Sequence, residues 1–298
     1  SLRGLGLELR TDAYGALRGA QGVVLTTYGI GPHEPAGDNA AGLALIKQAA
    51  LLGECLSRAA RTHGATALAL AQGSVAASSS VLNGQQAPLQ AVHTSLAGMV
   101  SAASLEAALA DAASRNTAAP EGTVPQMADP LVAVSARAGL AVAAGQDVVL
   151  SSGDVLGLLA GQDVQVAGGA EARVLAGQSL GILAGAVKGD GAAKGSGLTL
   201  VAAQGAVALQ AQAGTAQVAA KGLVTVQSAQ ASVEWASAKK IVLATAKGAC
   251  ITIEGAGVTS QCPGKLTIHA AKKEFVQPGN VSYTMPPFPA AQLPGTFD

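Results

Sequence analysis

The most regular pattern in the chain is an eight-residue repeat of glycine and apolar residues in its second half. When each octet is numbered from its glycine, positions four and six are apolar or Ala, and position eight is small. A short repeat with such alternation predicts stacked strands, each octet supplying one strand and one turn. The predicted turn glycines are Gly145, Gly153, Gly161, Gly169, Gly177 and Gly185, and the side chains predicted to line the axis of the stack are Val148, Leu150, Leu156, Leu158, Val164, Val166, Val174, Leu180 and Ile182.

A strand of this length cannot bury its own apolar side chains, so many octets must share one axis. Three consecutive octets of one chain can form one rung of a solenoid. Alternatively, three chains can each give one octet per layer and wind around one another, which leaves almost no free sheet edge. Repeat length alone does not choose between these arrangements. With about nineteen octets at roughly 4.8 Å per layer, an intertwined shaft would be roughly 90 Å long.

The segments on either side of the octets have different patterns. A glycine-rich loop at 188–197 interrupts the octets, and after it the step drifts between eight and ten residues. We therefore predict a mainly β fold of stacked octets with a helical insertion. Its predicted segments are short strands at 1–37, a helical hairpin at 38–119, the β-helical shaft at 120–275 and a Pro-rich extended tail at 276–298.

The helical hairpin is predicted from spacings of three and four residues and from end signals. One apolar face follows the N-cap candidates Asp38 and Asn39, and Gly64 can close the helix after a basic last turn. A second Ala-rich stretch begins at Pro88 and carries leucines as far as residue 109. The face predicted for the first helix consists of Leu45, Ala49, Leu52, Leu56 and Ala59.

Composition favours a narrow structure over a wide globular core. The 298 residues include 38 Gly but only one Trp, three Tyr and three Phe, although 49% are hydrophobic. Small side chains let backbones approach closely. Eighteen basic and eighteen acidic residues cancel, which argues against nucleic acid as a partner. Three cysteines are too few for a disulfide framework and fit a reducing compartment.

No catalytic, cofactor or metal site is predicted. The four histidines share no ligand spacing with one another or with the cysteines, and no His and acid accompany Cys250 or Cys262 as a nucleophile would require. The loop at 188–197 lacks the ending of a phosphate-binding loop. His269 most simply faces outward, although three copies of it facing a shared axis would bind an ion.

The tail combines prolines, which keep it extended, with aromatic residues. One interpretation is a strap that folds on the shaft or a disordered end. The other is a docking segment for a partner, since aromatic side chains in an extended segment suit partner pockets. The aromatic residues concerned are Phe275, Tyr283, Phe288 and Phe297.

The N-terminal motifs Leu2-Arg3-Gly4, Leu9-Arg10-Thr11-Asp12 and Leu17-Arg18-Gly19-Ala20-Gln21-Gly22 resemble the C-terminal region of the valine-glycine repeat protein G (VgrG) family. The helical stretch and the octets are similar to that family as well. VgrG proteins are spikes of bacterial type VI secretion systems. The resemblance implies a homotrimer whose chains form an intertwined trimeric β-helix, with 1–37 continuing from a base domain outside this sequence. The spike would sit on the secretion tube through that base domain. It would be made in the bacterial cytoplasm, pierce the target membrane, and pass into the target cell or the medium.

The resemblance also implies a PAAR-repeat cap protein at the distal end and effectors or adaptors as cargo, without general catalytic residues. Two other classes of function stay open from the residues. A monomeric β-solenoid adhesin or surface-binding module would share the repeat. A lyase-like enzymatic solenoid would carry charged and aromatic residues on one face, and the octet region has only Trp235.

Overall fold

The computed structural model of the chain describes residues 9–71, 82–114, 117, 119–186, 197–279 and 283–285. The chain divides into two compact units, Ser1–Thr199 and Leu200–Asp298. The first unit contains the helices, and the second contains a three-stranded sheet. The loop expected at 188–197 lies outside the described residues except for Gly197.

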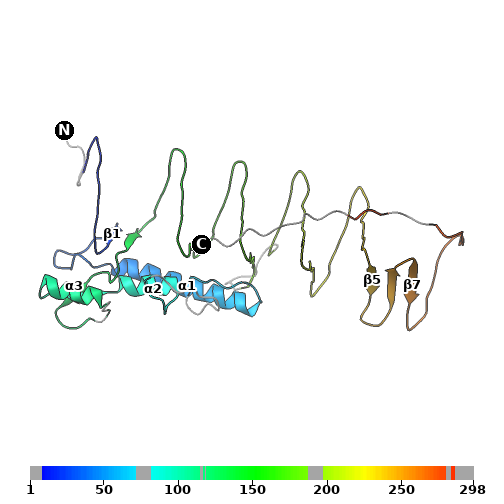
Figure 1. Cartoon of the computed structure of the whole chain (residues 1–298), viewed down its shortest axis with the longest axis horizontal. Coiled ribbons are helices and arrows are strands. Elements are labelled where there is room, and N and C mark those ends of the chain that lie inside the picture. The colour runs from blue at the N-terminus through cyan, green and yellow to red at the C-terminus, as the bar shows by residue number, and fades with distance from the viewer. Residues whose placement is uncertain are drawn as a thin grey trace. The chain divides into compact units, whose positions relative to one another are not determined.

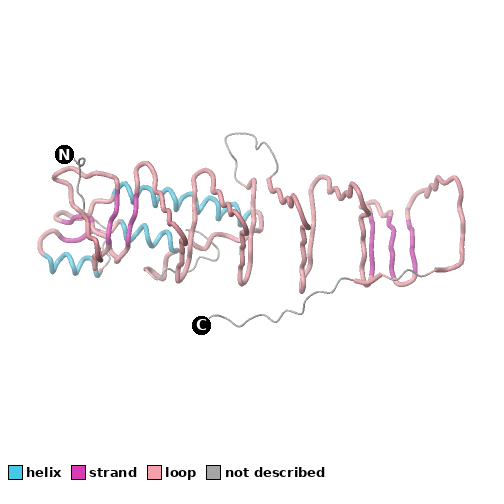
Figure 2. Tube along the Cα trace, turned by 90° about the horizontal axis from the view of Figure 1, so that it is seen from above, coloured by secondary structure: helices cyan, strands magenta, loops and turns pink. Residues whose placement is uncertain are grey.

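Two helices of the first unit, α1 (Ala40–Thr62) and α2 (Pro88–Leu96), lie side by side (Figures 1 and 2). The backbone N–H of Ala40 donates to Asp38 Oδ1 at 2.9 Å, which satisfies one free donor at the start of α1. Gly64 follows the last turn with a φ of 66°, a conformation that glycine adopts without strain. The N-terminal signal at Asp38 and the closing glycine therefore act where the sequence predicts them.

The second predicted helix is shorter than expected, because the chain changes direction after Leu96. The strand β2 (Met99–Ser101) follows α2 and pairs antiparallel with β3 (Thr123–Pro125). The helix α3 (Leu105–Ala113) lies in the segment between these two strands. A side chain at Gly98 would collide with the backbone oxygen of Gln126. This close approach needs glycine, so a packing requirement overrides the helical pattern.

The buried face of α1 consists of small residues and is rotated from the leucine face predicted by spacing. Leu45 is 40% exposed, whereas Ser57 is fully buried. Small residues allow α2 and the segment Ala65–Ala71, here called the return segment, to lie close to the helix axis. The length and hydropathy of α1 also meet the criteria for a membrane-spanning helix, a test that core helices pass too. The buried residues of α1 are Gly42, Ala50, Gly53, Ser57 and Ala60.

A parallel strand pair joins the beginning of the chain to the start of the octet region. The strand β1 (Val23–Thr26) pairs with β4 (Val132–Ser135), so residues more than one hundred positions apart are adjacent. Among residues 9–37, β1 is the strand that forms, whereas several short strands were expected there. The buried core of the first unit includes Val100, Ala91 and Met127.

In the second unit, the end of the octet region folds as an antiparallel meander instead of further octets. It consists of β5 (Lys240–Ala244), β6 (Cys250–Glu254) and β7 (Gly257–Gln261). The hairpins turn at Gly248 and Gly255, whose φ angles are 91° and 56°. This meander explains why the step of the repeat drifts in this part of the predicted shaft at 120–275.

The mainly β fold class is only partly visible in a single chain. Between β4 and β5 the described residues run back and forth in extended stretches without assigned strands (Figure 2). A strand is assigned when its backbone bonds to a neighbour, and these stretches have no such neighbour in their own chain. The described residues of a single chain therefore do not form the predicted β-helix by themselves.

Candidate functional site

The octet side chains predicted to line an axis lie open to solvent in the single chain. All nine are between 55% and 83% exposed, with Val148 at the lower limit and Val166 at the upper. Burial of apolar surface is the main driving force for folding, and a monomer forgoes it here. These residues come from one continuous run of chain, but the chain alone does not bring them together into a core.

The backbone of the same region is equally unpartnered. In 138–186 and 197–239, the described stretches of the octet region between β4 and β5, no backbone N–H bonds to another backbone carbonyl. By contrast, β1 and β4 are joined by a full parallel ladder immediately before. Extended backbone with free donors and acceptors is a template for pairing with another chain.

The chain bends at each of the six predicted turn glycines. A Cβ added at any of the six would meet nothing within 4 Å, and Gly185 is the one with a positive φ, at 67°. Within one chain, therefore, neither crowding nor backbone conformation accounts for glycine at the other five positions.

Two glycines at another position of the octet are in close contact with the return segment. A methyl group at Gly157 would lie 2.7 Å from Leu70 Cδ2, and one at Gly181 would lie 3.1 Å from Thr66 Cβ. On α1 itself, a Cβ at Gly53 would lie 3.7 Å from Leu159 Cδ1. The arm formed by α1 and the return segment thus lies on the octet region of its own chain.

The reasoning from sequence missed this contact, although a signal for it is present. Both octets that contact the arm carry Leu-Gly-x-Leu-Ala-Gly, at Leu156–Gly161 and Leu180–Gly185. The two copies of this motif are 24 residues apart, which is three octets. Leu175, in the octet between Gly169 and Gly177, is 91% exposed, as expected if its octet does not face the arm.

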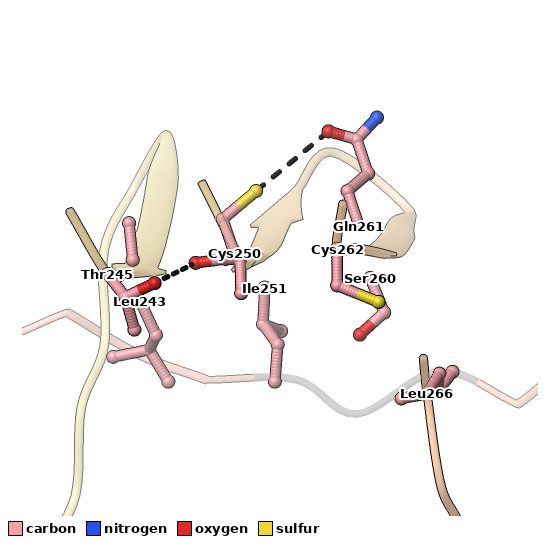
Figure 3. A pocket seen from close by; sticks show the side chains of 10 residues that line it. Leu243, Thr245, Cys250, Ile251, Ser260, Gln261, Cys262 and Leu266 are labelled. Atoms are coloured by element: carbon pink, nitrogen blue, oxygen red, sulfur yellow. Dashed lines mark hydrogen bonds between the residues drawn. The ribbon is translucent and has the colours of Figure 1, made fainter. Parts of the chain in front are cut away.

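An open pocket of about 400 Å³ lies on one face of the β5–β6–β7 meander (Figure 3). The Sγ atom of Cys250 lies 3.9 Å from Gln261 Oε1, and Thr245 Oγ1 donates to the carbonyl oxygen of Ala249 at 3.4 Å. None of the ten lining residues is His, acidic or basic. The pocket lining therefore offers no general base that could activate the thiol of Cys250 or Cys262. Across the described part of the chain, no three His, Cys, Asp or Glu residues cluster as metal ligands would.

Two described residues of the tail lie against the octet region of the second unit. Tyr283 and Met285 line a pocket of about 710 Å³ together with Trp235 and its neighbours at 234–238. Phe275, in contrast, is fully exposed. The other two aromatic residues proposed for docking, Phe288 and Phe297, lie outside the described residues.

Two family models match the chain. The model for "Uncharacterized protein conserved in bacteria (DUF2345)" matches residues 119–279. The model for "Putative type VI secretion system Rhs element Vgr" matches residues 1–60. No curated protein matches the chain.

Two solved structures have a similar fold. One is described as "Structure of the Tle1 effector bound to the VgrG spike from the Type 6 secretion system", with a TM-score of 0.67 at 21% identity; the match covers 91% of this chain and 67% of that one. The other, "The VgrG spike from the Type 6 secretion system", has a TM-score of 0.66 at 21% identity, covering 90% and 82%. At this identity the likeness is one of fold.

The octet region and the N-terminal motifs thus point to the same group of proteins. The first model covers more than half of the chain, and the second covers the segment that contains the Leu-Arg-Gly motifs. The chain belongs to the DUF2345 family and is a VgrG protein of the type VI secretion system.

Proposed function

We propose that three copies of this chain intertwine through their octets into the shaft of a type VI secretion spike, which pierces a target membrane and carries effectors. The observation that carries the proposal is the exposed apolar octet region with an unpaired backbone. Two further copies would cover those side chains and bond to those amides. No single-chain packing among the described residues does so.

The spacing between successive turns of the chain supports three copies over a single-chain solenoid. Thr66 lies over Gly181 and Leu70 over Gly157. Four residues of extended chain span at most about 14 Å. The helix α1 gives a second measure of this spacing, because Gly53 lies near Leu159 and the helix ends at Thr62, close in sequence to Thr66. The ten residues from Gly53 to His63 rise about 15 Å.

Strands in a sheet are about 4.8 Å apart, so a separation of about 14 Å corresponds to three strand spacings. A single-chain solenoid would stack octets 24 residues apart at about one spacing. A separation close to that upper limit would leave room for two further strands between successive turns. Two other copies would supply them.

Force transmission follows from this architecture. A closed rod with a continuous backbone ladder resists bending, because bending would strain many hydrogen bonds at once. Separating three wound chains also requires extensive unfolding, so resistance to dissociation would be kinetic as well as thermodynamic. A rod of this kind suits the piercing role, and the role we propose needs no catalytic residue.

The cargo role is supported by the related spike that was solved bound to the Tle1 effector. For this chain we propose that an effector or its adaptor rides on the spike and that a PAAR-repeat protein caps the distal end. Exposed Phe275 and the tail beyond it are candidate contacts. Deleting residues 279–298 tests the docking role: co-purification of cap and effector at wild-type levels would contradict it.

The assembly itself is tested by the mass of the purified protein. We expect light scattering to give three times the chain mass of 28.9 kDa, and the particle to survive SDS at room temperature. A stable, compact particle of single-chain mass would overturn the spike proposal and favour the alternative of a monomeric β-solenoid that binds surfaces.

A further inference from the structure

The return segment lies against glycines of two octets of its own chain that are three octets apart, which raises the question of what it faces in between. Thr66 and Leu70 cover Gly181 and Gly157, which are separated by two octets that turn away to the other faces of the shaft. Between those two residues lies Leu68, half-buried in the single chain. In an extended stretch, alternate residues share a face, so Leu68 points the same way as Thr66.

The occupant of that space follows from the winding of the copies, and this step rests on the proposed trimer. In such a trimer each chain advances one face of the shaft per octet and rises by about one strand spacing of 4.8 Å. The strand above Gly157 on the arm's face is then the next octet of one neighbour. The strand above that is the second following octet of the other neighbour.

Counting octets identifies the residues. The position that holds Gly157 and Gly181 in their octets is occupied by Gln165 and Arg173 in the two octets between them. Gln165 of one neighbouring copy and Arg173 of the other would therefore lie beneath the return segment, in that order. Their own arms cover Gly157 and Gly181 of their own chains on the other two faces.

We propose that the return segment of each copy is a clamp that crosses the strands of both other copies, with Leu68 placed over Gln165 of one and Arg173 of the other. Two glycines anchor the clamp on its own chain because they leave room for Thr66 and Leu70. The longer side chains at the two positions between are those that the clamp meets from its partners. The arm thereby joins all three chains and fixes their relative register.

Cysteine pairs test the clamp in the whole chain. In a background where Cys55, Cys250 and Cys262 are replaced by serine, we would compare L68C with Q165C, and L68C with R173C. After mild oxidation and boiling in SDS without reductant, either pair is expected to give a covalent trimer that reductant returns to monomer. A matched control, T66C with G181C, is expected to close within one chain and leave the monomer mass unchanged.

The outcomes separate the clamp from the trimer on which it rests. If light scattering gives a trimer but both Leu68 pairs remain monomeric while the control pair closes, the clamp is wrong and the intertwined shaft stands. A monomer by light scattering removes the shaft and the clamp together.

A second measurement covers failure of the cysteine-free background to fold. A photo-crosslinking p-benzoylphenylalanine at Leu68, in the chain with its native cysteines, is expected to give multi-chain products whose cross-linked peptides contain Gln165 or Arg173. Products confined to single chains would overturn the clamp.

Discussion

The helical region and the octet region are both rich in small apolar residues, yet these residues differ in burial between the two regions. In the helical region Ala50, Ala60, Ala71 and Ala91 are buried within one chain. In the octet region the nine predicted axis side chains, which are Val, Leu and Ile, stay more than half exposed. The first region completes a core within one chain, whereas the described octets of the second do not, and we propose that other copies complete it. Small size permits close packing, but chain topology decides whether the partner is internal.

The largest expected effect comes from a charge on the axis of the octets. V166D places a carboxylate from each of three copies on the shared axis, where burying each charge costs on the order of several kcal/mol. We expect the trimer mass to be lost in light scattering. The control Q162D changes an exposed turn position, where acids such as Asp163 already occur, and should leave the trimer intact. Equal behaviour of the two variants would show that the octets do not face an axis.

A smaller effect is expected where the two regions touch. G181V adds a branched side chain against Thr66, whose Cβ already lies 3.1 Å from the place of a first methyl group. Overpacking of this kind costs about 1–3 kcal/mol. Hydrogen exchange of residues 65–71 is expected to speed up. The control G84A, at a site with nothing within 4 Å, should leave it unchanged.

Two buried serines allow the helical core to be tested by itself. Ser95 Oγ accepts a hydrogen bond from the backbone N–H of Asp129 at 3.0 Å, whereas Ser57 Oγ is buried without a partner. S95A strands that donor and should destabilise the helical core by about 1–3 kcal/mol. S57A removes an unsatisfied hydroxyl and should be neutral or stabilising by about 1 kcal/mol. Thermal unfolding followed by the circular dichroism of the helices measures the stability of both variants. A larger loss of stability in S57A than in S95A would contradict the hydrogen bonding described for the two serines.

The smallest effect concerns the tail. Trp235 is the single tryptophan of the chain, so its fluorescence reports one place. Because Tyr283 and Met285 share its pocket, truncation after Gly279 should shift its emission to longer wavelength by a few nanometres. An unchanged spectrum would mean that the tail does not lie against Trp235 in solution.

Sequence reasoning anticipated features that depend on neighbouring residues and missed those that depend on distant ones. The bends at every eighth residue could be predicted from the spacing of the glycines. The ends of α1 could be predicted from Asp38 and Gly64, which adjoin the helix in the sequence. The break at Gly98 is not local, because its cause is the backbone of Gln126. The meander at 240–261 was missed because two hairpins with alternating apolar residues resemble a drifting octet.

The candidate site follows the same division. The axis residues were predicted as a set because alternation alone selects them, and in the proposed trimer their partners lie in other copies. The contact of Thr66 and Leu70 with two glycines was not predicted, because its sequence signal recurs only every third octet. A search for the eight-residue period averages such a signal away.

The arm contacts two glycines that are 24 residues apart, and this contact restricts which changes in the number of octets the proposed shaft can accept. In the proposed trimer, removing one octet before Gly157 would turn Gly157 and Gly181 through a third of a revolution, away from their own arm. Removing three octets, which is a full turn, would restore the alignment. Beyond Gly181 no such constraint applies. We therefore expect natural and engineered spikes of this kind to vary in steps of one octet toward the tip but only in whole turns beneath the arm.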